Sequence, residues 1–185
     1  MPHITVAPHL PGITGLLEYR QDTAEPIRAL TQLILRGPGT LTFAEREMIA
    51  TVVSQANECR FCTAAHAAVT DVLLGESETC ELIQTDIELA PISEKMKSLL
   101  QIAKLTQRGG HFVTESAVTR AKNNGATDLE IHDTVLIASL FCLYNKYVDG
   151  LATKLPDDSE YFKQLGARIA LSYGRRPDGY EKPLV

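Results

Sequence analysis

Apolar residues recur along most of the chain at intervals of three and four, which places them on one face of an α-helix. Glycine, proline and capping residues interrupt this pattern repeatedly, so it divides into separate helices with short connections. The run VLIASLF at 135–141 also fits a buried strand, but it lies inside a much longer helical pattern, and we favour a helix. The sequence therefore predicts an all-α fold. Its helices are expected at residues 25–36, 42–57, 59–74, 76–84, 93–107, 114–123, 127–151 and 158–173, after a short helical turn at 11–17.

Two of these helices begin with a capping box, in which a threonine and a glutamate three residues later satisfy free backbone N–H groups. The pairs are Thr42 with Glu45 and Thr127 with Glu130. The helix at 127–151 is almost wholly apolar in its first half, and we expect it to be buried on most faces.

The chain has 185 residues, enough for one well-buried domain. Within this single domain we distinguish an N-terminal helical extension at 1–40, a compact multi-helix core at 41–152, and a C-terminal helix and tail at 153–185. The tail at 174–185 is polar and contains proline, so we expect it to be mobile or extended over a neighbouring surface.

Two helices, at 25–36 and 158–173, have apolar faces that are larger than one small core can use. Surplus apolar surface of this kind is commonly covered by another subunit. We therefore expect substantial burial between subunits and a homo-oligomer.

The charge balance argues against a nucleic-acid partner. With 18 Lys and Arg against 23 Asp and Glu, the net charge is −5, and no basic run is present. The same balance disfavours an anionic membrane surface, and no apolar run approaches the length of a membrane span. The N-terminal residues lack the charged and apolar regions of a secretory signal, so we expect a cytoplasmic protein whose four cysteines are reduced.

The segment ANECRFCTAAHAA at 56–68 contains a C-x-x-C pair followed by a histidine. On a helix, Cys59, Cys62 and His66 lie on one face, and the two sulfur atoms are close enough to form a disulfide. Cys59 is expected in the first turn, where free N–H groups and the helix dipole favour a thiolate. Cys62 is expected one turn deeper, where the His66 imidazole can take its proton. This dithiol beside a base is what thiol–disulfide exchange and peroxide reduction both require.

Two other interpretations of the cysteines remain open. A zinc ion could bind Cys59, Cys62 and His66, but a closed structural site needs a fourth ligand, and no second C-x-x-C or H-x-x-x-H motif is present. The thiols could instead be inert residues of the core. The isolated residues that we interpret as passive or exposed are Cys80, Cys142, His111 and His132.

Three polar residues interrupt the apolar pattern of the last long helix, namely Tyr144, Asn145 and Asp149. Asn145 and Asp149 share a helix face, and they need hydrogen-bond partners if they are buried. They could bond across a helix interface, or, with Tyr144, they could form a wall of a pocket near the thiols.

The ordered set of Glu47, Cys59, Cys62 and His66 resembles the alkylhydroperoxidase D/carboxymuconolactone decarboxylase superfamily, in which a glutamate precedes a C-x-x-C-x-x-x-H motif. The resemblance covers roughly residues 40–152. The stretch LYNKYVDGL near its end is similar to the F-N-x-x-x-D-x-L pattern of the peroxidase-related subgroup. The resemblance implies an all-helical core that assembles into homo-oligomers, commonly trimers or hexamers.

The resemblance also implies a peroxidase whose two cysteines alternate between dithiol and disulfide. Cys62, the cysteine nearer the histidine, would meet a hydroperoxide substrate, and Cys59 would resolve the sulfenic acid. Glu47 and His66 would form a proton relay, and an external dithiol or protein reductant would restore the thiols. No bound cofactor or metal is implied. Helix propensity alone favours a solvated carboxylate for Glu47, so its place in a relay is a hypothesis.

Two features limit this resemblance. Alkylhydroperoxidase D proteins often carry a second histidine directly before the second cysteine, where this chain has Phe61, so proton transfer there is absent and the approach is narrower. The decarboxylases of the superfamily generally lack the C-x-x-C pair, which argues against their activity here. Two alternatives to a peroxidase stay open: a non-catalytic redox sensor or thiol–disulfide partner, and a lactone enzyme of the decarboxylase type.

Overall fold

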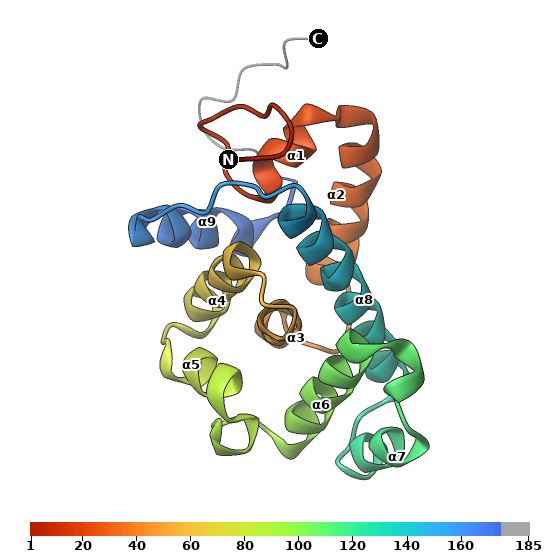
Figure 1. Ribbon diagram of the computed structural model, residues 1–185. Helices are drawn as coiled ribbons and strands as arrows, with labels where there is room; N and C mark the ends of the chain where they lie inside the picture. The colour runs from red at the N-terminus through yellow and green to blue at the C-terminus, as the bar shows by residue number, and fades with distance from the viewer. Residues whose placement is uncertain (175–185) are drawn as a thin grey trace.

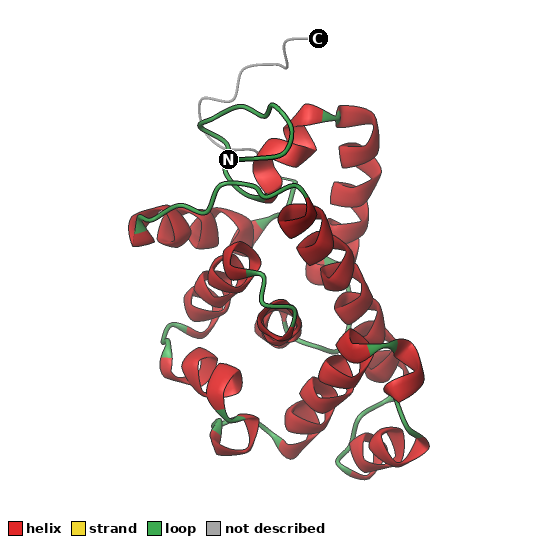
Figure 2. Ribbon diagram, in the orientation of Figure 1, coloured by secondary structure: helices red, strands yellow, loops and turns green. Residues whose placement is uncertain are grey.

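The computed structural model describes residues 1–174, and every regular element in that range is helical (Figure 2). The α-helices are α1 (Ile13–Tyr19), α2 (Gln21–Arg36), α3 (Phe43–Ala56), α4 (Arg60–Leu74), α5 (Glu78–Thr85), α6 (Glu94–Arg108), α7 (Glu115–Asn123), α8 (Asp128–Gly150) and α9 (Ser159–Leu171). Two single turns of 3₁₀-helix, η1 (Ile87–Leu89) and η2 (Gly110–Phe112), lie on either side of α6. The predicted all-α fold is confirmed. Apart from Gly174, the expected tail lies outside the described residues.

Capping residues set two helix starts as the sequence predicts. Thr42 accepts a hydrogen bond from the N–H of Glu45, and the Glu45 carboxylate accepts one from the N–H of Thr42. Thr127 and Glu130 form the same reciprocal pair at the start of α8.

The start of α2 differs from the sequence prediction. The helix begins at Gln21 rather than at residue 25, and Pro26 lies inside it. A start at residue 25 would place the proline in the first turn, where its missing N–H has no consequence. The longer helix forgoes one backbone hydrogen bond at Pro26, but its added turn buries Ala24 in the core.

Helix α3 lies at the centre of the molecule. Figure 1 shows it end-on, and it packs against α4, α6 and α8. Every residue from Arg46 to Ser54 is buried, including the charged residues Arg46 and Glu47. The Arg46 guanidinium donates to the backbone carbonyls of Ile34, Gly37 and Leu41. Because a buried charge is costly without a partner, Glu47 must also be paired, and its partners form the site described below.

Helix α8 is predicted to be buried on most faces, but one stripe is exposed. Leu129, Leu136 and Leu143 follow one another at seven-residue intervals and are 52%, 36% and 48% exposed. The opposite face, which includes Ile137 and Phe141, is buried. The prediction overstates the burial because the exposed stripe has no covering element within residues 1–174.

Helix α9 packs across α4 (Figure 1). Leu165 and Ile169 of α9 are buried, and Gly166 lies where the two backbones approach most closely. A Cβ atom on Gly166 would lie 2.8 Å from the Ala68 carbonyl oxygen, so glycine is needed there. Part of the apolar face of α9 is therefore used within the subunit, while Leu171 at its end is 72% exposed, and a role of α9 between subunits stays a prediction. The second helix with a predicted surplus of apolar surface is α2, and its Leu33 is 64% exposed.

The N-terminal segment runs beside the connection between α8 and α9. The N–H of His3 donates to the Leu151 carbonyl at 3.0 Å, and that of Gly12 donates to the Lys154 carbonyl at 3.2 Å. Helices α1 and α2 follow and pack against α8. No helix within residues 1–174 is both long and apolar enough to cross a membrane.

Candidate functional site

A tight junction between α3 and α4 positions the two cysteines. Asn57 ends α3, and Glu58 follows with a φ of 59°, in the left-handed region. The N–H groups of Glu58 and Cys59 donate to the carbonyls of Gln55 and Ser54 at 2.8 and 3.0 Å. This pair of bonds is a Schellman motif, in which a glycine usually occupies the left-handed position. Cys59 therefore completes one helix end and begins the next.

Cys59 is the N-cap of α4, and Cys62 is the third residue of that helix. The sequence prediction, which starts the helix at Cys59, is wrong because the Schellman motif delays the start to Arg60. Consequently Cys62 lies in the first turn, where free N–H groups and the helix dipole favour negative charge. From the sequence, this stabilisation of a thiolate is expected at Cys59 instead.

Both thiols are free and buried, with Cys59 0% and Cys62 3% exposed. The pKa of Cys59 is raised far above its ordinary value, first by its hydrogen bond with the Cys62 sulfur and then by burial. Cys59 therefore keeps its proton near neutral pH, and its thiol interacts with the Asp149 carboxylate as well as with the Cys62 sulfur.

Glu47 is fully buried on α3, and its carboxylate contacts one guanidinium and one imidazole. One oxygen accepts from Arg36 Nη2 at 2.6 Å, and the other lies 2.7 Å from His66 Nδ1. Burial alone would raise the pKa of Glu47. The hydrogen bond and charge of His66, with the charge of Arg36, outweigh burial and hold that pKa below its ordinary value. The structure thus brings Glu47 and His66 into direct contact.

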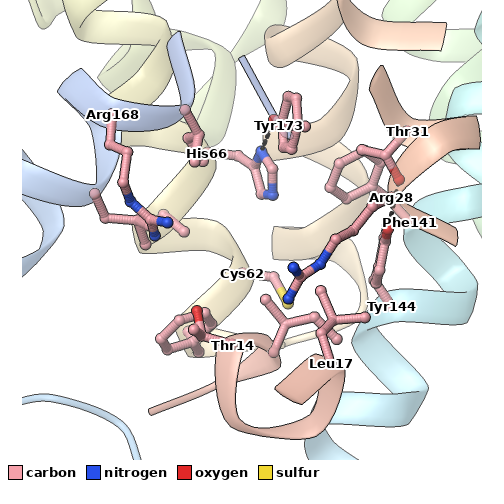
Figure 3. Close-up of a pocket in the computed structure, with 15 residues that line it drawn as sticks. Thr14, Leu17, Arg28, Thr31, Cys62, His66, Phe141, Tyr144, Arg168 and Tyr173 are labelled. Carbon is pink, nitrogen blue, oxygen red and sulfur yellow. Dashed lines mark hydrogen bonds between the residues drawn. The ribbon is translucent and has the colours of Figure 1, made fainter. Parts of the chain in front are cut away.

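Tyr173, just beyond α9, joins the same network. Its hydroxyl donates to Glu47 at 2.6 Å and lies 3.3 Å from His66 Nδ1 (Figure 3). Its ring is nearly parallel to the His66 ring, at 15°, and faces the Arg36 guanidinium at 4.8 Å. Burial and the Glu47 carboxylate raise the pKa of Tyr173 well above its ordinary value, so the hydroxyl remains a donor.

Sequence reasoning misses both Arg36 and Tyr173. Arg36 is 11 residues from Glu47 and lies on a different helix, and Tyr173 is 126 residues away. No helical spacing can connect residues on separate elements. Arg36 could be found from the sequence only indirectly. A glutamate that is buried requires a cationic partner, and Arg36, the last residue of the preceding helix, is a candidate for that partner.

A cavity of about 90 Å³ opens over Cys62 and His66. Its lining consists of Ile13, Thr14, Leu17, Arg28, Thr31, Phe61, Cys62, Ala65, His66, Phe141, Tyr144, Leu165, Arg168, Ile169 and Tyr173. Cys59 and Glu47 are not among these residues and lie behind the wall. Figure 3 shows the His66 nitrogen that Glu47 does not hold pointing into the cavity. No hydrogen bond joins His66 directly to Cys62 in the described chain, so a proton passing between them needs a bridging water or substrate.

Known proteins share this architecture. Residues 21–73, from α2 to α4, match the model of the carboxymuconolactone decarboxylase family. The structure is similar to an alkylhydroperoxidase AhpD core, a peroxidase-related protein from Ralstonia eutropha JMP134, with a TM-score of 0.75 and 25% identity over 84% of this chain and 80% of that one. Both matches support the resemblance to the alkylhydroperoxidase D-like/carboxymuconolactone decarboxylase superfamily that the sequence predicts.

Two further solved structures share the fold. A peroxidase-related protein from Silicibacter sp. TM1040 has a TM-score of 0.75 and 24% identity over 84% of this chain and 80% of its own. A protein from Agrobacterium tumefaciens, described as a putative antioxidant defence protein AhpD, has a TM-score of 0.67 and 18% identity over 77% of this chain and 97% of its own. No curated protein matches the sequence.

Phe61, the residue directly before Cys62 in the sequence, lines the cavity with its ring. The ring packs against Phe162 of α9 at 5.7 Å between centroids. It also presses against Gly12, where any Cβ atom would lie 2.2 Å from the ring. Phe61 is thus fixed in the cavity wall beside Cys62, and its effect on access to the thiol stays a prediction.

Two of the three polar residues of the late-helix pattern, Tyr144 and Asn145, take the two roles that the sequence leaves open, whereas Asp149 is exposed and does not line the cavity. Tyr144 lines the cavity and bonds to the Thr31 hydroxyl, and burial raises its pKa to about 12. Asn145 is buried instead at the junction, where it donates to Ser54 at 3.0 Å and accepts from Asn57 at 2.8 Å. Tyr144 therefore belongs to the site, and Asn145 holds the end of α3 in place.

The isolated histidines His111 and His132 and the isolated cysteine Cys80 do not line the cavity. His132 is exposed and pairs with Asp133, and His111 contacts Phe112 in η2. Cys80 is buried on α5, which raises its pKa to about 12. Within residues 1–174, no three His, Cys, Asp or Glu side chains form a group that could hold a metal ion.

Proposed function

We propose that this protein is a C-x-x-C-dependent peroxidase that reduces hydroperoxides through a Cys59–Cys62 disulfide cycle. The observation that carries the proposal is the asymmetry of the two thiols. Cys62 lines the cavity from the first turn of α4, whereas Cys59 is wholly buried outside the cavity lining, in hydrogen-bond contact with the Cys62 sulfur and with a raised pKa. The likeness to peroxidase-related proteins supports the same class of reaction.

In the first step, the Cys62 thiolate attacks the terminal oxygen of the hydroperoxide. An S–O bond forms as the O–O bond breaks, and the alcohol leaves with a proton from the His66 imidazolium. His66 has accepted this proton from Cys62 through a water or the substrate in the cavity. Cys62 is thereby oxidised to a sulfenic acid, and the peroxide is reduced to an alcohol.

In the second step, the Cys59 sulfur attacks the Cys62 sulfur. The S–S bond forms, the S–O bond breaks, and the hydroxyl leaves as water with the proton of Cys59. An external dithiol then reduces the disulfide by two exchange reactions and becomes a disulfide itself.

Glu47, assisted by Arg36 and Tyr173, positions His66. A carboxylate at Nδ1 holds the tautomer whose Nδ1–H points at Glu47, which leaves Nε2 as the acceptor on the cavity side. When His66 gains a proton, the buried negative charge of Glu47 stabilises the imidazolium.

Counting free thiols before and after one equivalent of hydroperoxide tests the proposal. Fully reduced wild-type protein should lose two thiols, faster than free cysteine does, and Cys62→Ser should lose none in that time. Cys80→Ser is the matched control, since Cys80 is equally buried but lies outside the cavity, and it should behave as wild type. No loss in the wild type, or equal loss in Cys62→Ser, would contradict the proposal. A lactone reaction in this cavity would instead persist with both cysteines changed to serine.

A further inference from the structure

The cavity over Cys62 has a charge pattern that peroxide reduction by itself does not require. Its lining includes two arginines, Arg28 from α2 and Arg168 from α9, and none of its 15 lining residues is an aspartate or a glutamate. Most of the other lining residues are apolar. Among residues 1–174, two guanidinium groups thus border one small and mostly apolar cavity. An uncharged alkyl hydroperoxide would gain less binding energy from these guanidinium groups than an anion would.

Arg28 places its charge near the reactive sulfur. Figure 3 shows the guanidinium group extending from α2 toward Cys62. One of its nitrogens, Nη2, forms an ion pair with Glu18, whose side chain is 5% exposed and is not part of the lining. This ion pair fixes the direction of the guanidinium. Because a guanidinium has five N–H donors in a fixed plane, donors remain for a second anion.

The surroundings strengthen the attraction of Arg28 for an anion. Ile13, Leu17 and Phe141 line the same cavity, and charges attract more strongly beside apolar groups than in water. Arginine and a carboxylate form two parallel hydrogen bonds when the geometry allows. At about 90 Å³, the cavity leaves room for a body of only a few heavy atoms beyond that contact.

We propose that this cavity selects small organic hydroperoxides that carry a carboxylate. The carboxylate binds Arg28, and the peroxide group lies at Cys62. Since both residues line one small cavity, the carboxylate must lie within a few bonds of the peroxide. Arg168 lines the cavity wall across from Arg28 (Figure 3). The peroxide part rests on the proposed function, whereas anion recognition by Arg28 does not.

Two alkylating reagents of similar size but different charge test the role of Arg28. Iodoacetate is an anion and iodoacetamide is neutral, and each forms a C–S bond with Cys62 and releases iodide. The measurement is the ratio of their rates at Cys62, followed by peptide mass spectrometry. Arg28→Gln should lower the iodoacetate-to-iodoacetamide ratio about tenfold relative to wild type, the loss expected for one charge-assisted contact. Any change in thiolate reactivity affects both reagents and cancels in the ratio.

Arg28→Lys keeps the charge without the planar fork and should give an intermediate ratio. The control Arg120→Gln removes an exposed arginine of α7 outside the cavity and should leave the ratio at the wild-type value. A further measurement needs no variant: propionate should slow the reaction of wild-type Cys62 with iodoacetamide, and 1-propanol at equal concentration should not.

The outcomes separate this inference from the peroxidase proposal. If Arg28→Gln leaves the ratio unchanged, or if propionate and 1-propanol act alike, the anion site is wrong even when peroxide oxidises both thiols. If the ratio falls as expected but peroxide leaves the thiols intact, the anion site stands and the peroxidase proposal fails. If both the anion site and the peroxidase activity are found, a carboxylate-bearing hydroperoxide should oxidise Cys62 faster than its neutral analogue does. Arg28→Gln should remove this difference in rate.

Discussion

At the scale of single residues, the site depends on a carboxylate that is wholly removed from water. Glu47 has three partners, Arg36, His66 and Tyr173, and each comes from a different helix or helix end. The arrangement keeps the carboxylate ionised in a buried position, where an unpaired one would take up a proton. It also gives His66 a fixed orientation toward the cavity.

Glu47→Gln preserves the shape of the side chain but leaves Arg36 buried without its counter-charge. We expect the free energy of unfolding, measured with urea near neutral pH, to fall by about 3 kcal/mol. The same change at an exposed position, Glu81→Gln on α5, should have almost no effect.

The pH dependence of that loss follows from the lowered pKa of Glu47. A carboxyl whose folded pKa lies below its ordinary value of 4.5 contributes stability that is complete above about pH 5 and is lost as the pH falls through the folded pKa. The difference between wild type and Glu47→Gln should therefore narrow below pH 4.5. A difference that stays constant down to about pH 3 would show that Glu47 is not held ionised.

Tyr173→Phe removes one hydrogen bond from the network and keeps the ring. Since the bond goes to a charged acceptor, we expect a loss of about 2 kcal/mol in the free energy of unfolding. The oxidation of Cys62 by hydroperoxide should also slow, because Glu47 is held less firmly against His66. Tyr147→Phe, a half-buried position on α8 outside the cavity, serves as the control in both measurements. If Tyr173→Phe and the wild type have equal rates of Cys62 oxidation and equal free energies of unfolding, Tyr173 has no role in positioning Glu47 and His66.

Sequence spacing predicts only part of this site. Cys59, Cys62 and His66 can be grouped because they belong to one helical segment, and Glu47 is added only by resemblance to a family. Arg28 and Tyr173 reach the site from separate helices, and their positions depend on tertiary packing that no local pattern encodes.

At the scale of the elements, periodicity and capping residues locate the helices, and the errors arise where backbone geometry overrides the pattern. The prediction of Cys59 inside the first turn fails because hydrogen bonding at the junction is not visible in side-chain spacing. The predicted start of α2 is wrong for a related reason. Burial of the turn before Pro26 stabilises the longer helix by more than the one hydrogen bond that Pro26 lacks.

The α3–α4 junction gives a stability prediction. Glu58 is exposed and adopts a left-handed conformation that costs an L-residue roughly 1–2 kcal/mol. Glycine removes this cost, but it also raises the conformational entropy of the unfolded chain, which offsets part of the gain in stability. Glu58→Gly should therefore raise the free energy of unfolding by about 0.5–1 kcal/mol. Glu58→Ala keeps the unfavourable conformation and should give no such gain. A destabilised Glu58→Gly, by thermal or urea unfolding, would contradict the conformational argument.

At the scale of the whole molecule, α1, α2 and α9 cover the end of α4 that carries the cysteines, so the site is built from both ends of the described chain. Exposed apolar side chains remain on α8, on α2 and at the end of α9. We expect self-association through the α8 stripe of Leu129, Leu136 and Leu143, because leucines at seven-residue intervals pack well against a like helix.

Light scattering after size-exclusion chromatography checks this expectation. The wild type should be an oligomer, and Leu136→Glu combined with Leu143→Glu should be a folded species of lower mass. Leu89→Glu, at an exposed position on η1, should leave the mass unchanged. A monomeric wild type, or an oligomer that both stripe substitutions leave intact, would exclude the stripe as the subunit contact.

The central claim is that Cys62 meets the peroxide and Cys59 resolves it, and the fate of each sulfur in the single-serine variants tests this most directly. Treated with one equivalent of hydroperoxide and a sulfenic-acid trap, Cys59→Ser should gain the trap at Cys62, and Cys62→Ser should gain none at Cys59. The wild type should instead lose two hydrogens and show a Cys59–Cys62 linkage by peptide mass spectrometry. Trapping at Cys59 in Cys62→Ser, with Cys62 unmodified in Cys59→Ser, would reverse the assigned roles and contradict the mechanism.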